Sequence, residues 1–101
     1  MHARMSIFEG PPHMIDEGVR QAREVVLPKT REIDPAFKGI IALTDRQTRK
    51  MVWITFWESE EAMGASEEAA DRLHEEETVE VAGGMVAGVE RYEVGLFELE
   101  S

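Results

Sequence analysis

The chain has 101 residues, a formal net charge of −10 and no cysteine. This length fits one domain, residues 1–101, and a hydrophobic share of 43% is enough for a core, which argues against general disorder. The lack of cysteine excludes disulfides, thiolate metal sites and a cysteine nucleophile. No apolar run approaches the ~20 residues that span a bilayer, and the alternating start MHARMSIFEG lacks the continuous apolar stretch of a signal peptide. We therefore expect a soluble cytoplasmic protein without membrane contacts.

The negative charge is concentrated in one segment. Residues 58–80 contain ten acidic residues and one basic residue, Arg72, which accounts for −9 of the net −10. Nucleic acid is repelled by such a segment, and no basic cluster with interleaved aromatic residues occurs elsewhere in the sequence. We interpret the segment as a solvated helix face that aids solubility, and we expect no nucleic-acid partner.

The first third of the chain predicts a strand followed by a helix. Residues 2–8 alternate, with Ala3, Met5 and Ile7 on one face. Apolar residues then recur at helical spacing from Pro12 to residue 33, and Pro28 falls inside this pattern. The helix either ends near residue 27 or continues with a kink to about residue 32. We favour the kink because Pro28 lies on the outer side of the helix.

The remaining chain predicts two strands, a second helix and a last strand. Residues 37–44 and 50–57 are strand-like runs that a polar hairpin loop, DRQTR, separates. Ser59 is a predicted N-cap, and an apolar stripe follows on the acidic helix. Two glycines at 83–84 interrupt the chain before a long last strand at residues 86–99.

This order, β-α-β-β-α-β, predicts an α+β fold of the ferredoxin-like type. Right-handed crossovers place both helices on one face of a four-stranded antiparallel sheet. The strand KMVWITFW is nevertheless apolar on both faces, with Trp53 and Trp57 on one and Ile54 and Phe56 on the other. An uncovered apolar face of several hundred Å² is larger than most monomers expose. We therefore expect a homodimer through the sheet face, with Trp53 or Trp57 losing solvent access on association.

The element order, the stretch MVWITFWESEEAM and the ending VERYEVGLFEL resemble the dimeric α/β-barrel superfamily. Within it, the sequence is most similar to the antibiotic-biosynthesis-monooxygenase (ABM) domains, over essentially the whole chain. The resemblance implies two four-stranded sheets packed face to face as a barrel, with the helices outside. Characterised members of the family include cofactor-free monooxygenases of polyphenols and quinols, and haem-degrading enzymes.

The haem-degrading branch of the family is disfavoured by the residues present. That branch relies on an Asn in the first strand, a Trp in the second helix and a His later in that helix, whereas this sequence has no Asn. The position of the family's Trp falls near Ser66, and that of its His falls near Glu76. His74 is two residues from the latter position, about 200° around a helix. We expect no haem turnover and no cofactor.

Oxygenation of a quinol asks less of the protein: a base, a cation near the developing anion, and an apolar cavity. We predict such a site between the second helix and the sheet. Its candidate residues are His74 as the base, Arg4 or Arg91 beside the anion, and Trp53, Trp57 and Tyr92 as stacking walls.

Each candidate also has a structural interpretation. Large aromatic residues such as the two tryptophans are common in cores and interfaces. His74 also fits a surface position beside Asp71 and Glu77, and these three side chains are too few for a zinc site, so we expect no metal. Tyr92 also fits a place at a sheet edge.

Two functions therefore stay open, and the sequence does not decide whether the protein is an enzyme. One is a cofactor-independent monooxygenase acting on a small aromatic or quinol-like compound. The alternative is a non-catalytic homodimer of the same fold that binds a small molecule or has a stress-related role.

Overall fold

The computed structural model describes residues 1–67 and 85–100. Its elements in chain order are β1 (His2–Glu9), α1 (His13–Gln21), the π-helical turn η1 (Ala22–Val26), α2 (Leu27–Ile33), β2 (Phe37–Asp45), β3 (Lys50–Trp57) and β4 (Met85–Glu93). Residues 60–67 are also helical. Among the described helices, none has the length and apolar character needed to cross a membrane.

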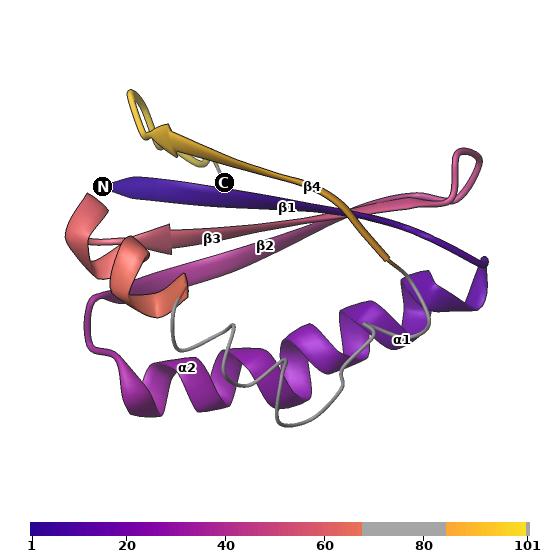
Figure 1. Ribbon diagram of the computed structural model, residues 1–101, viewed down its shortest axis with the longest axis horizontal. Coiled ribbons are helices and arrows are strands. Elements are labelled where there is room, and N and C mark those ends of the chain that lie inside the picture. The colour runs from indigo at the N-terminus through magenta and orange to yellow at the C-terminus, as the bar shows by residue number, and fades with distance from the viewer. Residues whose placement is uncertain (68–84, 101) are drawn as a thin grey trace.

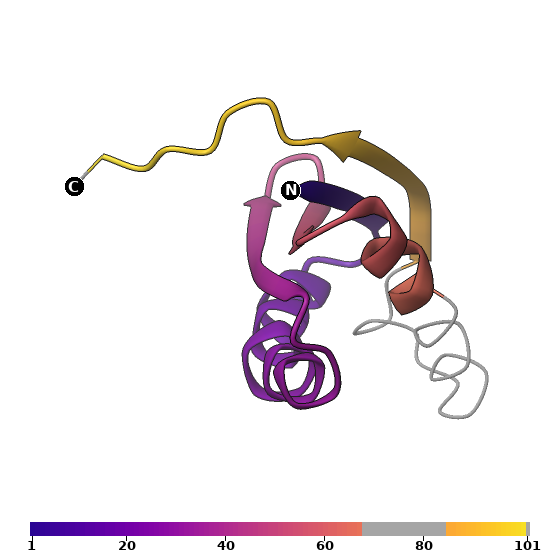
Figure 2. The same cartoon turned by 90° about the vertical axis from the view of Figure 1, so that its left-hand side faces the viewer.

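The four strands form one antiparallel sheet in the order β2-β3-β1-β4. Helices α1 and α2 and the helical residues 60–67 lie on the same side of this sheet in both views (Figures 1 and 2). Strands that are adjacent in sequence, β2 and β3, form a hairpin, while β1 lies between β3 and β4. The predicted ferredoxin-like α+β fold is confirmed.

The first helix continues through Pro28, as the helical periodicity predicts. The chain is helical from His13 to Ile33, with the π turn immediately before Leu27 and Pro28. The Leu27 N–H donates to the carbonyl of Ala22, five residues back, instead of four. Proline cannot donate a backbone hydrogen bond, and its ring clashes with the carbonyl four residues earlier in a regular α-helix. The wider π turn relieves this conflict, so the helix does not end at residue 27.

Two polar residues act locally as the sequence predicts. In the β2–β3 hairpin, Asp45 Oδ1 accepts hydrogen bonds from the backbone N–H groups of Gln47 (3.0 Å) and Thr48 (3.3 Å). After β3, Ser59 Oγ accepts from the backbone N–H of Ala62 at 3.1 Å. The first contact closes the turn, and the second caps the helical residues 60–67.

The core lies between the sheet and α1, η1 and α2, and it takes both tryptophans. Trp53 is 8% exposed and packs edge-on against Phe8, with ring centroids 4.9 Å apart. Trp57 is 2% exposed and packs against Phe37, with centroids 5.2 Å apart. The expectation that Trp53 or Trp57 loses solvent access on association is therefore wrong. The helices of the same chain already cover the tryptophan side of β3.

The opposite side of the sheet is also apolar. Met5 pairs with Ile54, which pairs with Ile41, and directly paired residues in a sheet point to the same side. We call the apolar part of this side, on β1, β2 and β3, the second face; it consists of Ala3, Met5, Ile7, Ile41, Leu43, Val52, Ile54 and Phe56. On β4, Glu90 and Tyr92 lie on the same side of the sheet. Leu43 is 50% exposed, and Met5 and Ile54 are partly exposed.

The last strand is shorter than the predicted range 86–99. It ends at Glu93, which is opposite His2, the first residue of β1. Beyond this point one further backbone hydrogen bond forms, from the Val94 N–H to the carbonyl of Met1, the residue before β1, at 2.9 Å. A strand needs a partner for its backbone groups, so the sheet stops where β1 begins.

Residues 95–100 form an arm that leaves the sheet and projects beyond it (Figure 2). Phe97 packs edge-on against Phe56 of the second face, with ring centroids 5.1 Å apart. Leu96 and Leu99 are 81% and 79% exposed. The arm thus carries two apolar side chains that a single chain leaves in water.

Candidate functional site

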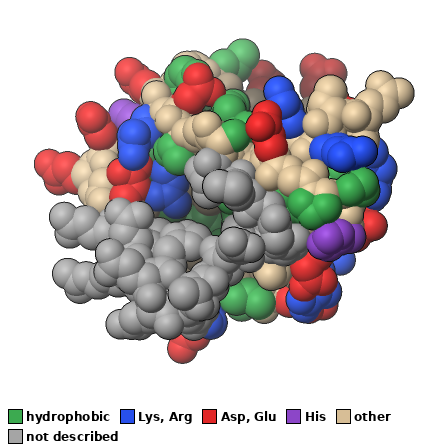
Figure 3. All heavy atoms as spheres, turned by 45° about the vertical axis from the view of Figure 1, so that its right-hand side comes forward, with side chains coloured by type: hydrophobic (Ala, Val, Ile, Leu, Met, Phe, Trp, Pro, Cys, Tyr) green, Lys and Arg blue, Asp and Glu red, His purple; other side chains and the backbone are tan. Residues whose placement is uncertain are grey.

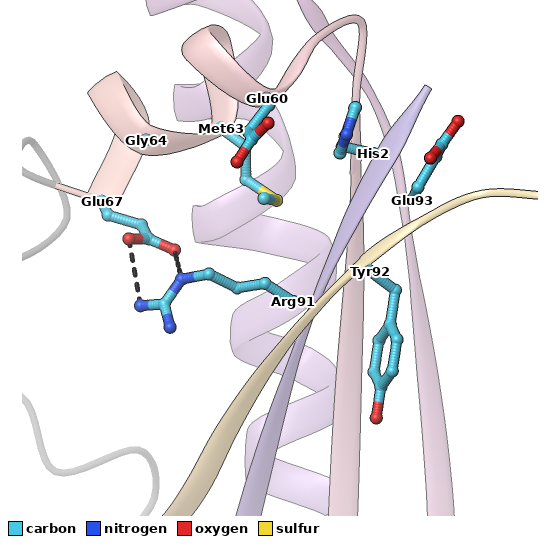
Figure 4. A pocket seen from close by; sticks show the side chains of 8 residues that line it. All are labelled: His2, Glu60, Met63, Gly64, Glu67, Arg91, Tyr92 and Glu93. Carbon is cyan, nitrogen blue, oxygen red and sulfur yellow. Dashed lines mark hydrogen bonds and ion pairs between the residues drawn. The ribbon is translucent and has the colours of Figure 1, made fainter.

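A pocket of about 380 Å³ lies between the helical residues 60–67 and the ends of β1 and β4. The residues that line it are His2, Glu60, Met63, Gly64, Glu67, Arg91, Tyr92 and Glu93 (Figure 4). The pocket lies on the helix side of the sheet, where the sequence predicts a site between the second helix and the sheet. On the face shown in Figure 3, acidic and basic side chains are interspersed with small apolar groups.

Arg4 and Arg91 meet on one carboxylate beside this pocket. The two residues are direct partners across β1 and β4, so their side chains leave the sheet on the same side. Arg91 donates from Nε and Nη2 to the two oxygens of Glu67, at 2.5 and 3.0 Å. Arg4 Nη1 lies 3.9 Å from Glu67 Oε1. Paired N–H donors on both oxygens are the strong geometry for arginine and a carboxylate.

The side chains of this cluster, Arg4, Glu67 and Arg91, differ in their exposure to solvent. The side chains of Arg4 and Glu67 are 17% and 23% exposed, whereas that of Arg91 is 53% exposed. Arg4 therefore lies beneath the cluster and Arg91 at its open side. The structure brings together the two cations that the sequence offers as alternatives.

His2 is a pocket residue that the sequence analysis does not select. Its Nδ1 atom is buried and has no hydrogen-bond partner in the part of the chain that the structure describes. His2 lies opposite Trp57 on β3 and Glu93 on β4. The available signal is the two-residue spacing from Arg4, which puts both side chains on the same side of β1.

Tyr92 reaches the pocket at its rim. Its ring points away from His2 and Arg91 (Figure 4), as alternation along β4 requires. A hydrogen bond with Glu90 and the charge of that carboxylate raise the pKa of Tyr92 above its ordinary value. The phenol is 50% exposed and lies with Glu90 on the second-face side of the sheet.

The two tryptophans contact the core, and neither is among the residues that line the described pocket. The indole N–H of Trp57 donates to Thr55 Oγ1 at 3.0 Å. Trp57 packs with Met63, and Met63 lines the pocket, so Trp57 supports the pocket from behind. The Trp53 indole nitrogen is buried without a hydrogen-bond partner among the described residues. The stacking role of Trp53 and Trp57 stays a prediction.

His74, the predicted base, lies outside the described residues, and so do its neighbours Asp71 and Glu77. Within residues 1–67 and 85–100, no group of three or more His, Asp or Glu side chains is placed to hold a metal ion. At the position near which the haem-degrading branch has its Trp, Ser66 donates from its hydroxyl to the carbonyl of Met63 at 2.6 Å.

Comparison with solved structures decides the fold. A variant of MhuD, in a crystal structure with two manganese protoporphyrin IX molecules bound per active site, aligns over 99% of this chain with a TM-score of 0.73 and 20% identity, and all of the MhuD chain is covered. The ActVA-Orf6 monooxygenase of Streptomyces coelicolor, in complex with nanaomycin D, aligns over 99% of this chain and 92% of its own, with a TM-score of 0.67 and 20% identity. The chain has the ferredoxin-like, ABM-like fold of these solved structures.

Sequence comparison relates this ABM-like domain to longer proteins. No family model matches the sequence. Rv2558 and Rv2557, two uncharacterized proteins of Mycobacterium tuberculosis, are 33% and 32% identical to it over 96 and 94 residues. These alignments cover 95% and 93% of this chain but 39% and 41% of the two relatives. The chain therefore spans about two fifths of the length of these relatives.

Proposed function

We propose that this ABM-like domain is a cofactor-independent monooxygenase that acts on a small aromatic or quinol-like compound. The observation that carries the proposal is the pocket of about 380 Å³ beside the Arg4–Arg91 pair. Its volume lies in the range of ~300–1,000 Å³ that is usual for small-molecule sites. A pocket with cations at its wall suits a substrate that becomes an anion during the reaction.

The reaction needs little from the protein. A base removes a proton from the electron-rich ring system, and the resulting anion reacts with O₂ to form a carbon–oxygen bond. The protonated base returns its proton to the peroxide anion. Loss of the remaining hydrogen from the same carbon then breaks the O–O bond, so one oxygen atom stays in the product as a carbonyl group and the other leaves as water. For anthrone, a keto tautomer of a hydroxyanthracene, the balanced reaction is anthrone plus O₂ to anthraquinone plus water.

We assign the residues to these steps as follows. Arg91 lines the pocket with Arg4 beneath it, and Glu67 holds Arg91 in place before any charge appears. We assign Arg91 to the oxyanion that develops within a substrate that enters the pocket neutral. His74 remains the proposed base. His2 is a second candidate, since it is the imidazole that the described part of the pocket contains.

The experiment uses anthrone and O₂ labelled with oxygen-18. We expect O₂ uptake and anthraquinone formation in a one-to-one ratio, above the rate without protein, with one labelled atom per product molecule by mass spectrometry. Arg91→Gln should lower the rate by about 10²-fold, since removing one donor to an oxyanion has effects of that size. Arg46→Gln is the matched control, because Arg46 pairs with Asp16 away from the pocket and should keep the wild-type rate.

A non-catalytic binding role is the second candidate. It is favoured by the position of Trp53 and Trp57, whose rings are in the core and leave the described pocket with few aromatic walls. Saturable binding of the aromatic compound without O₂ uptake would support this function over the first.

We also propose that two copies associate through the second face. In one chain this face leaves Met5, Ile54 and Leu43 partly or half exposed, and the arm leaves Leu96 and Leu99 in water. A second copy offers the same apolar surface, so the contact is self-complementary about a two-fold axis. Burial of both surfaces removes the apolar area from water.

A further inference from the structure

The charges around the pocket disfavour a ligand that is already an anion when it enters. Among its lining residues, Glu60, Glu67 and Glu93 carry −3 and Arg91 carries +1, so the described lining is −2 with His2 neutral. Inclusion of Arg4 leaves the sum at −1. Like charges brought together at a binding surface cost several kcal/mol, which is how wrong partners are rejected.

The arginine that lines the pocket presents its paired donors to Glu67. Nε and Nη2 of Arg91 are the edge that best receives a carboxylate, and both contact the Glu67 oxygens. Arg4 approaches Glu67 from the neighbouring strand at 3.9 Å. A ligand carboxylate must therefore compete for Arg91 with a carboxylate that the chain itself holds in place, and tethering gives that group a high effective concentration.

We infer that Glu67 is a specificity-determining residue, which occupies the arginine pair and thereby selects neutral aromatic ligands over aromatic carboxylates. The inference rests on the proposed function in one respect, namely that a small aromatic compound enters this pocket. Neutral phenols and quinols then enter without displacing Glu67. Aromatic acids of the same shape are rejected because the pocket is negative and its arginine is occupied.

The test compares two probes of nearly equal shape, naphthalene-2-carboxamide and naphthalene-2-carboxylate, by isothermal titration at one pH and salt concentration. The wild-type protein should bind the carboxamide at least about tenfold more tightly than the carboxylate. Glu67→Gln should tighten carboxylate binding by about tenfold or more and should change carboxamide binding much less, so that the preference falls.

Glu60→Gln is the matched control, because Glu60 lines the same pocket and the substitution removes the same charge. It should change the preference by less than about threefold if the occupied arginine, and not the summed charge alone, decides selection. Glu67→Ala provides a second variant, and thermal melting of each variant checks that it is folded.

The outcomes separate the inference from the proposed function. If Glu67→Gln leaves the carboxamide preference at its wild-type value, or tightens both probes equally, the role of Glu67 is refuted while the pocket stands. If neither probe binds the wild-type protein or any folded variant, the pocket is not an aromatic site. In that case the proposed function and the inference are both refuted.

Discussion

Replacing Thr55 by Val tests whether Trp57 belongs to the core of one chain. Thr55 is 7% exposed, and its hydroxyl accepts a hydrogen bond from the Trp57 indole N–H at 3.0 Å. The same hydroxyl donates to the carbonyl of Arg4 at 3.5 Å, across β1 and β3. Valine has nearly the same shape but no hydroxyl, so the indole N–H of Trp57, which is 2% exposed, is left without its partner.

The cost follows from this geometry. A buried donor that loses its acceptor costs about 1–3 kcal/mol, and the longer contact to Arg4 adds little. We expect Thr55→Val to lower the free energy of unfolding by about 2 kcal/mol. With a urea dependence of ~1–3 kcal/mol per molar for a small protein, the unfolding midpoint should fall by about 1 M at unchanged slope.

The assay is urea unfolding followed by tryptophan fluorescence, with all variants at one protein concentration because association also adds stability. Thr55→Ser keeps the hydroxyl and should cost about 1 kcal/mol or less, the value of a buried methyl group. Trp57→Phe removes the N–H, so Thr55→Val should cost at least about 1 kcal/mol less in that background. An equal cost of Thr55→Val in both backgrounds would refute the reasoning, since the hydrogen bond would then contribute nothing.

Three further predictions concern assembly and the hairpin. Ile54→Asp places a charge at the centre of the second face, so light scattering should show a monomer in place of the wild-type dimer of ~23 kDa. Gln47→Asp in the exposed hairpin is the control and should remain a dimer. A wild-type monomer at micromolar concentration would count against the dimer. Leu96→Ser with Leu99→Ser should raise the dimer dissociation constant without lowering the free energy of unfolding of the monomeric Ile54→Asp variant, because both leucines are exposed in one chain. The backbone N–H of Thr48, followed by the Thr48 side chain and the Gln47 N–H, lowers the pKa of Asp45 below its ordinary 3.8. The ionised Asp45 therefore stabilises the protein above pH 3.8, and this stabilisation is lost as the pH falls through the lowered pKa. The difference in melting temperature between the wild type and Asp45→Ala should become smaller in acid. A difference that grows in acid would contradict this prediction.

The sequence by itself determined the types and the order of the described elements, because these depend on local patterns; the second predicted helix is described only as far as residue 67. Alternation in β1, the hairpin signal at Asp45 and the N-cap at Ser59 are short-range effects of backbone geometry and nearby hydrogen bonds. The right-handed crossover then leaves the ferredoxin-like sheet as the arrangement for this order, and the structure has it.

Which side of β3 the helices cover was decided by the tertiary structure. Both sides are apolar, so the pattern of the strand does not distinguish them, and packing of Trp53 against Phe8 beneath α1 settles the choice. The same holds for the end of β4, where apolar residues continue to Leu99 but the sheet stops opposite His2. A strand's length depends on its partner as well as on its own residues.

The candidate site divides in the same way. Arg4 and Arg91 were predictable as candidate cations of the site, because both are arginines in predicted strands. That they are direct partners and share Glu67 follows from the register of β1 against β4 and from the position of residues 60–67 above them. His2 joins the pocket through the same register. Register is set by contacts between residues far apart in sequence, so it cannot be predicted from the periodicity of a single strand.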